Sequence, residues 1–345
     1  MNHRFLVSIS TVAAVAAAGV LVSLGAAGQV EPAPANAWTP PRDPEGRPDL
    51  QGVWDYRTIT PLERPASLGT KEFFTTAEEA ATFESEENRR QNRDLIDPEQ
   101  GGLNYPPGGV VPYNEFWYDR GDKLGSMRTS LIVDPPDGRL PPWTAEGQKI
   151  ADRRAIERRD DQLGRPHADS WEDRPLQERC IVGLNAGPPM TPGAYNNNVQ
   201  LLQTKGFVVI LNEMVHSARI VPMDGRPHGT IRQWKGDSRG RWEGDTLVVD
   251  TINFKRETNL PGSSAGTHLI ERFTRTGPDT LLYEFTVDDP TMWTRSWTAQ
   301  VPMLKSAEPI YEYACHEANY AMTGILAGAR AAEKEAEAAA KQASK

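Results

Sequence analysis

The stretch that decides the fold is residues 213–254, which reads EMVHSARIV (213–221), DGRPHG (224–229), WKGDSRGRWEGD (234–245) and TLVVDTINF (246–254). Short runs of alternating residues are separated here by Asp-Gly, Arg-Gly and Gly-Asp pairs. Gly and Asp tolerate the positive φ that tight hairpin turns need. The stretch therefore predicts an antiparallel β meander, which we expect to continue to about residue 317.

Ionisable residues fall among apolar neighbours in successive predicted strands. Side chains alternate across a strand, so every second residue shares a face. The predicted faces are His216 with Met214, Ala218 and Ile220; Asp250 with Val248, Ile252 and Phe254; Glu271 with Leu269 and Phe273; Arg295 with Trp293, Trp297, Ala299 and Val301; and Glu317 with Tyr313 and Cys315. An unpaired buried ion is unfavourable by several kcal/mol. These groups therefore either pair inside a core or face a wet cavity.

Both interpretations are open at the level of single residues. In the first, Arg295 pairs with Glu271 or Asp250 in a buried bridge, and His216 is a hydrogen-bonded core histidine. In the second, the sheet closes into a barrel whose strands each direct one polar group into a ligand cavity. The complete set favours the cavity, because a dry core has little use for one ionisable group in every strand.

Composition agrees with a mainly β chain. The 345 residues are 38% hydrophobic and 25% charged, with 29 Gly and 28 Pro, which favours short strands and long Gly/Pro loops over a helical bundle. We expect two or three peripheral helices. The capping box Thr76-Ala-Glu-Glu79 predicts one that runs to about Arg93, and a second is predicted over 144–161. The net charge of -9 and the absence of a basic stripe exclude nucleic acid as an expected partner.

The two ends of the chain differ from its middle. Residues 1–37 have a basic start, an apolar run and small residues that suit a signal peptidase, which predicts a cleaved signal peptide and a periplasmic or secreted protein with no membrane segment in its mature form. An uncleaved membrane anchor is the alternative. Residues 38–327 are predicted to form a single domain, and 328–345 a polar Ala/Glu/Lys tail outside any site.

Cysteine usage points the same way. Cys180 and Cys315 are the chain's two cysteines, and in an exported protein they predict a disulfide. A catalytic cysteine next to His316 is the alternative, whereas two thiols without CxxC spacing make a poor zinc site.

Candidate chemistry rests on histidines and carboxylates. The sequence has no GxGxxG, P-loop, HExxH or GxSxG motif, so no cofactor is expected. A histidine near a carboxylate is the usual general acid/base pair. A metal site built from His216, His268 and His316 is the alternative, since three imidazoles suffice for zinc or iron.

Several strings resemble an uncharacterised family of secreted bacterial proteins: PDLQGVW (48–54), VDPPDGR (133–139), GDSRGRWEGDTLVV (236–249), ERFT (271–274) and YEYACHE (311–317). The resemblance covers most of residues 48–328 and implies no known activity. Gly52-x-Trp54 together with the meander is also similar to the opening of lipocalin-like (calycin) barrels. That similarity implies a lipocalin-like barrel, in a wider group whose members include hydratases, cyclases and lyases that work without a cofactor.

The first hypothesis is therefore an exported lyase, hydratase or isomerase that acts by acid/base chemistry on a small, partly apolar, possibly aromatic molecule. His216 and His316 are the predicted proton carriers, Glu271 and Asp250 orient them, and Arg295 holds developing negative charge. The predicted substrate-binding residues are Trp293, Trp297, Tyr313 and His268. A periplasmic binding protein without turnover is the second hypothesis, and a His-ligated metalloenzyme is the third.

Overall fold

Antiparallel strands make up most of the regular structure. The computed structural model describes residues 38–102, 106–109, 114–163, 167–183, 185–256 and 262–343. The chain divides into two units, residues 1–39 and 40–345, and the description below concerns the second. The predicted signal segment lies outside the described residues.

The described residues contain a ten-stranded sheet in the order β5-β4-β3-β1-β10-β9-β8-β7-β6, with β2 paired to β10. Every ladder between neighbouring strands is antiparallel. The strands are β1 (Gly52–Asp55), β2 (Ile132–Asp134), β3 (Asn198–Gln203), β4 (Phe207–Asn212), β5 (Ala218–Pro222), β6 (Asp237–Glu243), β7 (Thr246–Ile252), β8 (His268–Gly277), β9 (Thr280–Asp288) and β10 (Trp297–Ser306). The predicted antiparallel meander is confirmed from β6 to β10, but it ends at Ser306 rather than near residue 317, and β5 lies at the other edge of the sheet.

The turn between β6 and β7 shows why the central stretch folds as predicted. Glu243 pairs with Thr246, so Gly244 and Asp245 form a two-residue turn. Gly244 has a φ of 59°, which glycine adopts without steric cost. The predicted hairpin at Lys205-Gly206 likewise joins β3 to β4.

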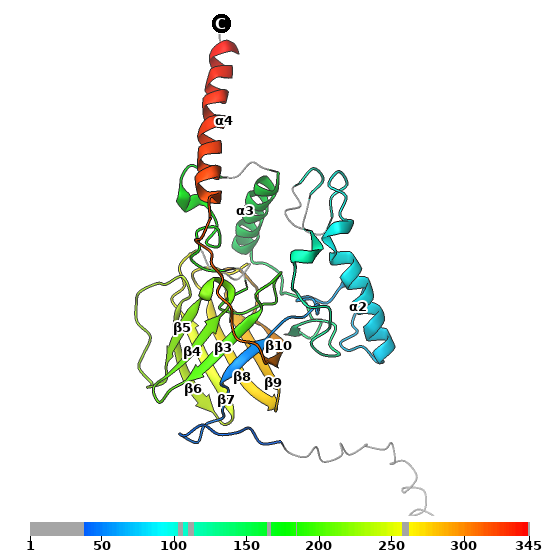
Figure 1. The fold of residues 1–345 in the computed structure, drawn as a ribbon, viewed down its shortest axis with the longest axis vertical. Coiled ribbons are helices and arrows are strands. Elements are labelled where there is room, and N and C mark those ends of the chain that lie inside the picture. Colours follow the sequence, from blue (N-terminus) through cyan, green and yellow to red (C-terminus); the bar gives the residue numbers. More distant parts are fainter. Residues whose placement is uncertain are drawn as a thin grey trace, which may run out of the picture. The chain divides into compact units, whose positions relative to one another are not determined.

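The sheet curls so that its two terminal strands approach one another (Figure 1). A Cβ built on Gly240 of β6 would lie 2.2 Å from Met223 Sδ and 3.0 Å from Val221 Cγ1 of β5. No ladder joins β5 to β6 in the described part of the chain. In these residues, the contacts across this seam involve side chains rather than a backbone ladder, and closure of a barrel by strand pairing is not confirmed.

The core fills the inner face of the curled sheet. Inward and outward residues alternate along β8, β9 and β10, as a sheet with one buried face requires. The fully buried inward side chains of these strands include Leu269, Phe273, Leu281, Tyr283, Phe285, Val287, Trp297, Ala299, Val301 and Met303. Trp54 of β1 is also fully buried, and its Nε1 donates to Leu50 O at 2.9 Å.

The helices lie outside this sheet (Figure 1). They are α2 (Ala77–Gln91), α3 (Ala145–Gln162) and α4 (Ala321–Ala343), with short 3-10 helices η1 (Ala66–Leu68), η2 (Arg93–Leu95), η3 (Glu115–Trp117), η4 (Trp171–Asp173) and η5 (Met214–His216). The hydroxyls of Thr76 and Thr144 accept from the backbone N–H three residues on, which confirms both predicted helix starts. Glu79 accepts from Thr75 N rather than Thr76 N, so the capping box is incomplete.

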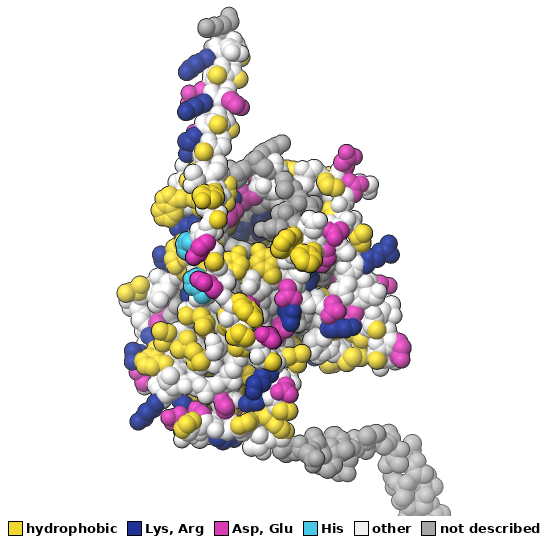
Figure 2. All heavy atoms as spheres, viewed as in Figure 1, with side chains coloured by type: hydrophobic (Ala, Val, Ile, Leu, Met, Phe, Trp, Pro, Cys, Tyr) yellow, Lys and Arg dark blue, Asp and Glu magenta, His cyan; other side chains and the backbone are white. Residues whose placement is uncertain are grey.

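Helix α4 begins before the predicted tail and buries none of its residues. Lys, Arg and Glu side chains lie along it among apolar ones (Figure 2). It therefore matches the solvated helix that the composition of the C-terminal residues allowed. In the described ranges, no helix combines the length and the apolar character needed to cross a membrane.

The strand faces predicted from alternation are correct for β8 and wrong for β5. Leu269, Glu271 and Phe273 point inward, as expected. Before β5, Val215 and His216 have φ of 57° and 37°, and this kink places Arg219 inside while leaving Ile220 66% exposed. A local turn has shifted the alternation by one residue.

The remaining predicted faces also need correction. Asp250 does share a face with Val248 and Ile252, but it is the outer face, because Leu247 and Val249 belong to the core. Strand β10 begins only at Trp297, so Arg295 precedes it. The segment with Tyr313, Cys315 and Glu317 follows the end of β10 and is not a strand.

Candidate functional site

Glu271 is completely buried and is held by two partners. Arg219 donates from Nη1 and Nη2 to its carboxylate at 2.6 Å and 2.8 Å, and the Tyr283 hydroxyl donates at 2.7 Å. The Arg219 side chain is 4% exposed. The first interpretation of the sequence, a buried bridge at Glu271, is thus correct in kind, but its cation is Arg219 and not Arg295.

Asp250 and His268, two of the predicted site residues, meet on the outer face. Asp250 Oδ1 lies 3.1 Å from His268 Nε2 and 3.2 Å from His228 Nε2, and His228 Nδ1 lies 3.5 Å from Asp237 Oδ2. The hydrogen bond to His268 lowers the pKa of Asp250, and the same bond raises the pKa of His268. We call His228, Asp250 and His268 the outer histidine cluster.

Arg295 and His216 do not join these groups. The Arg295 guanidinium is half exposed and bonds Asp134 Oδ2 at 2.5 Å, so it is a surface ion pair. His216 is exposed at the end of η5. In the ranges that the structure describes, no three His, Cys, Asp or Glu side chains could hold a metal ion, and His216, His268 and His316 do not gather.

Lys235 lies at the seam between β5 and β6, close to the buried bridge. Its Nζ donates to Ser217 Oγ at 3.0 Å and to Ala218 O at 2.7 Å. Burial lowers the pKa of Lys235 to about 8, and the positive charge of Arg219 contributes. A lysine with such a pKa is a better base and nucleophile near neutral pH than an ordinary one.

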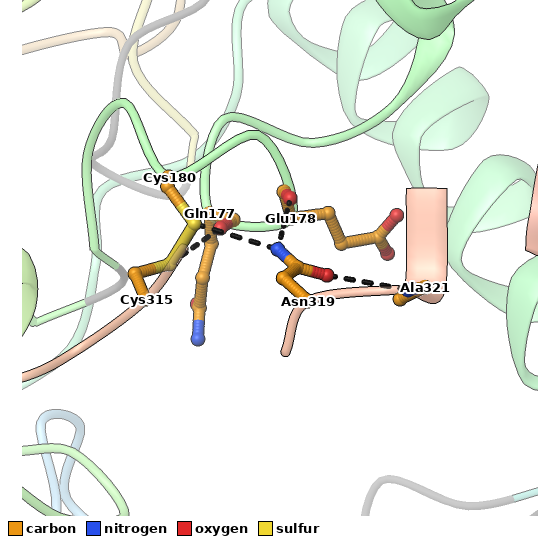
Figure 3. The surroundings of a disulfide bond; sticks show 6 residues. All are labelled: Gln177, Glu178, Cys180, Cys315, Asn319 and Ala321. Carbon is orange, nitrogen blue, oxygen red and sulfur yellow. Dashed lines mark hydrogen bonds between the residues drawn. A yellow bond between two sulfur atoms is a disulfide. The ribbon is translucent and has the colours of Figure 1, made fainter. Parts of the chain in front are cut away.

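The predicted disulfide is confirmed, and it lies beside His316. Cys180 and Cys315 are joined with Cα atoms 5.8 Å apart. Asn319 Nδ2 lies 3.5 Å from Cys180 Sγ, and its Oδ1 accepts from Ala321 N at the start of α4 (Figure 3). His316 and the disulfide line a cavity of about 320 Å³. The bond thus fixes the segment that carries His316, and in the described part of the chain no carboxylate bonds its ring.

Tyr313 stacks on Tyr195, with ring centroids 6.5 Å apart, and packs, like the two cysteines, against the small core of Ala186, Met214 and Val215. Trp293 is 1% exposed, stacks on Trp143 at 5.2 Å, and belongs to the core. Neither residue lines the cavity described next, so their positions give no direct support to a substrate-binding role there.

That hollow, which we call the main cavity, measures about 410 Å³. Its volume falls in the range of small-molecule sites. The walls come from the segment after β1, the end of α2, and two loops: Thr58, Ile59, Thr60, Pro61, Leu62, Gln91, Arg93, Tyr118, Arg120, Leu131, Leu140, Thr191, Pro192, Gly193, Ala194 and Trp297. Of the predicted site residues, Trp297 alone is in this set.

Two arginines give the main cavity its charge. The guanidinium carbons of Arg93 and Arg120 lie 5.2 Å and 4.6 Å from the centroid of the Tyr118 ring. Glu115 pairs with Arg120 at 3.0 Å, whereas none of the acidic residues that the structure describes lines the cavity itself. Trp297 is 1% exposed, and its Nε1 has no acceptor among the described residues. The cavity therefore combines apolar walls with positive charge and a spare indole donor.

The buried bridge helps to position one wall of the main cavity. The Tyr283 hydroxyl that donates to Glu271 also accepts from Met190 N at 3.0 Å, directly before Thr191. Further along, Gly193 N donates to Asn197 Oδ1 at 2.7 Å, and Asp119 N donates to Ala194 O at 2.7 Å. The wall is thus fastened both to the core and to the loop that carries Tyr118 and Arg120.

Sequence reasoning did not include Arg219, or any residue of the main cavity other than Trp297, among the predicted site residues. Arg219 stands in the quoted stretch, but the positive φ of Val215, a β-branched residue, carries no sequence signal. Arg93, Tyr118 and Arg120 lie in loops or at a helix end, where alternation gives no information. The sequence has no local motif that contains these three residues, so no pattern indicated that they would lie together.

Neither the family models nor the curated proteins include a match to this chain.

Proposed function

We propose that the protein binds a small, partly aromatic molecule with one negative charge in the main cavity. The observation that carries this proposal is the lining itself: two arginines on Tyr118, the buried Trp297, apolar neighbours, and no carboxylate. Arginine is well suited to a carboxylate or sulfonate, because its planar fork donates two parallel hydrogen bonds. The aromatic and aliphatic walls suit an apolar ring.

Binding without turnover is the reading that this lining favours. Among the described residues, the lining of the main cavity holds no histidine, aspartate, glutamate or cysteine, the usual general bases. Of the hypotheses drawn from the sequence, the second, a periplasmic binding protein, is thus the better fit. The disulfide supports export, since such bonds persist in oxidising compartments. The contacts across the seam between β5 and β6 support a barrel-like scaffold that keeps the walls in place.

The test uses 8-anilinonaphthalene-1-sulfonate, a monoanionic aromatic probe, titrated into the folded protein and followed by fluorescence and calorimetry. We expect one saturable site. Arg93→Gln should weaken it about tenfold, as loss of one charge-assisted hydrogen bond implies. The neutral probe N-phenyl-1-naphthylamine should bind more weakly than the sulfonate.

Arg128→Gln is the matched control. Arg128 lies 4.8 Å from the Phe73 ring and pairs with Glu72, so it repeats the arrangement of an arginine on an aromatic ring outside the main cavity. Equal affinity for both probes, or an equal loss in Arg128→Gln, would contradict the proposal.

The outer histidine cluster carries a second candidate function, acid/base chemistry. Two imidazoles share one carboxylate oxygen there, at 3.1 Å and 3.2 Å, which is the arrangement that orients a ring for proton transfer. This cluster contains Asp250 and His268 of the predicted site. The second imidazole belongs to His228, and not to His216 or His316 as predicted. If this cluster acts on a substrate, His268→Asn and Asp250→Asn should abolish turnover while leaving binding in the main cavity intact.

A further inference from the structure

A second, charged cavity lies between α3 and the loop that leads to the disulfide. It measures about 530 Å³, and we call it the arginine cavity. Its lining holds five arginines and four carboxylates: Arg154, Arg158, Arg174, Arg179 and Arg256, with Glu157, Asp161, Glu172 and Asp173; His167, Pro175 and Leu176 complete it. The numbers of positive and negative charges are nearly equal, but among the described residues most of the carboxylates form hydrogen bonds or ion pairs and most of the arginines do not.

The carboxylates of this lining are mostly engaged. Asp161 pairs with Arg174 at 2.9 Å, Glu157 lies 3.8 Å from Arg153, and Asp173 accepts from Ser170 N at the start of η4. Within the described residues, Glu172 is the lining carboxylate for which no such contact exists. Arg174 is also satisfied, by Asp161, Glu178 and the His167 carbonyl.

None of the other four arginines forms an ion pair among the described residues. There, the side chains of Arg158, Arg179 and Arg256 make no hydrogen bond, and Arg154 bonds only the Ser263 carbonyl at 3.0 Å. Burial lowers the pKa of Arg154, and the positive charges of Arg153 and Arg158 lower it further, whereas the negative charges of Glu157 and Asp289 oppose the shift. The four guanidinium groups therefore keep unused donors although carboxylates lie nearby.

Of these four arginines, Arg179 has the side chain whose position is best fixed for binding a ligand. Its guanidinium carbon lies 4.6 Å from the Trp171 ring and 5.8 Å from the Trp234 ring, and Nε is buried without an acceptor. Stacking holds the guanidinium by its faces and leaves its N–H groups, which lie in the ring plane, available to a ligand. Arg179 also lines the cavity beside the disulfide, so the adjacent Cys180 fixes its backbone.

We propose that the arginine cavity binds a tetrahedral oxyanion of the phosphate or sulfate type, held by Arg179 and by the arginines of α3. The unused donors of a stacked, half-buried guanidinium carry this inference, since such donors match the edges of an oxyanion. It is independent of the ligand in the main cavity, which has its own arginines. A phosphate group is recognised here whether it comes as the free ion or as part of a larger molecule.

The experiment titrates inorganic phosphate, sulfate and succinate, each at constant ionic strength, into the full chain and follows heat and tryptophan fluorescence. Trp171 and Trp234 flank Arg179, so their emission should change on binding. Saturable binding of phosphate or sulfate supports the proposal, and the tighter ion identifies the group. Succinate binding alone, or no saturable binding, overturns it.

Four variants make the result specific. Arg179→Gln should weaken binding about tenfold and Arg158→Gln, an exposed position that cannot disturb the core, about threefold. Glu172→Gln should strengthen binding, because it removes the lining carboxylate that has no contact. Lys149→Gln removes one charge from the same helix outside the cavity, and its partner Glu146 is not a lining residue, so it should change nothing. An equal loss in Lys149→Gln would mean only general charge attraction and would overturn the site.

Discussion

The guanidinium of Arg219 in β5 donates to both carboxylate oxygens of Glu271 in β8, at 2.6 Å and 2.8 Å, inside the curled sheet. The two strands are not neighbours in the sheet order, so the pair spans the interior. Buried ion pairs are strongly context-dependent, because desolvation of both ions opposes their attraction. What this pair contributes is best seen by removing one partner.

Glu271→Gln should lower the free energy of unfolding by about 3–5 kcal/mol, because it leaves the Arg219 charge buried and uncompensated. Arg219→Met combined with Glu271→Gln should lose less than Glu271→Gln alone, since no charge then remains. Urea unfolding measures both. The control is Glu243→Gln. It removes an exposed ion pair between Glu243 and Arg272, the residue next to Glu271 in β8, and should leave the free energy of unfolding close to that of the parent. A double variant less stable than Glu271→Gln would contradict this account.

Tyr283→Phe removes the hydroxyl that links Glu271 to Met190 N. We expect a loss of about 1–3 kcal/mol in unfolding free energy, because a buried N–H and a buried carboxylate each lose a partner. The wall at Thr191–Ala194 should also loosen, so that the anilinonaphthalene probe binds more weakly while the far-UV circular dichroism stays unchanged. Tyr311→Phe, at a position 61% exposed, serves as the control. Unchanged probe affinity in Tyr283→Phe would rule out this positioning role.

The outer histidine cluster makes stability depend on pH in a defined window. The pKa of His268 is raised above its usual 6.5, so its contribution is complete below that value and is lost as pH rises through the raised pKa. The pKa of Asp250 is lowered below its usual 3.8, so its contribution is complete above that value and is lost as pH falls through the lowered pKa. The contribution is therefore greatest between about pH 4 and pH 6.5.

The measurement is urea unfolding of the parent and of Asp250→Asn from pH 3 to pH 9. The difference in stability between them should peak within that window and decline on both sides. A difference that is flat across the range would show that the contacts of Asp250 with His228 and His268 are not coupled to protonation.

Loss of the disulfide should loosen the segment after β10. Cys180→Ser with Cys315→Ser is expected to cost about 2–5 kcal/mol in unfolding free energy, as for closure of a long loop. Tyr313, half-buried on Tyr195, should become a chymotrypsin site, whereas Tyr320, already 78% exposed, should be cut at the same rate in both proteins. Protection of Tyr313 in the serine variant would mean that the stack alone holds the segment.

Features governed by local patterns were predictable from the sequence, and features governed by long-range geometry were not. The Gly244 turn, the helix starts at Thr76 and Thr144 and the Cys180 to Cys315 bond follow from residue type and context. The inward position of Glu271 follows from alternation along an uninterrupted strand. Arg219 does not, because the kink at Val215 and His216 resets the alternation just before it.

The main cavity was beyond such reasoning for a different reason. Its walls come from parts of the chain that are far apart in the sequence, and residues such as Gln91 and Gly193 meet only after the sheet has formed. Trp297 was found because it begins an alternating strand, whereas Arg120 and Tyr118 belong to no periodic pattern. The residues of a site built from loops are brought together by the fold, so their spacing in the sequence does not reveal the site.

The position of β1 has a consequence for how the chain comes together. This strand of four residues lies between β3 and β10, whose residues begin at Asn198 and Trp297. When the chain is synthesised or threaded through a membrane from its N-terminus, Trp54 therefore emerges long before either neighbour exists. Non-local pairing of this kind slows folding. The first strand therefore lacks one of its two neighbours until β10, the last strand described, is available. During that time a chaperone that binds the unfolded chain would protect β1 from aggregation.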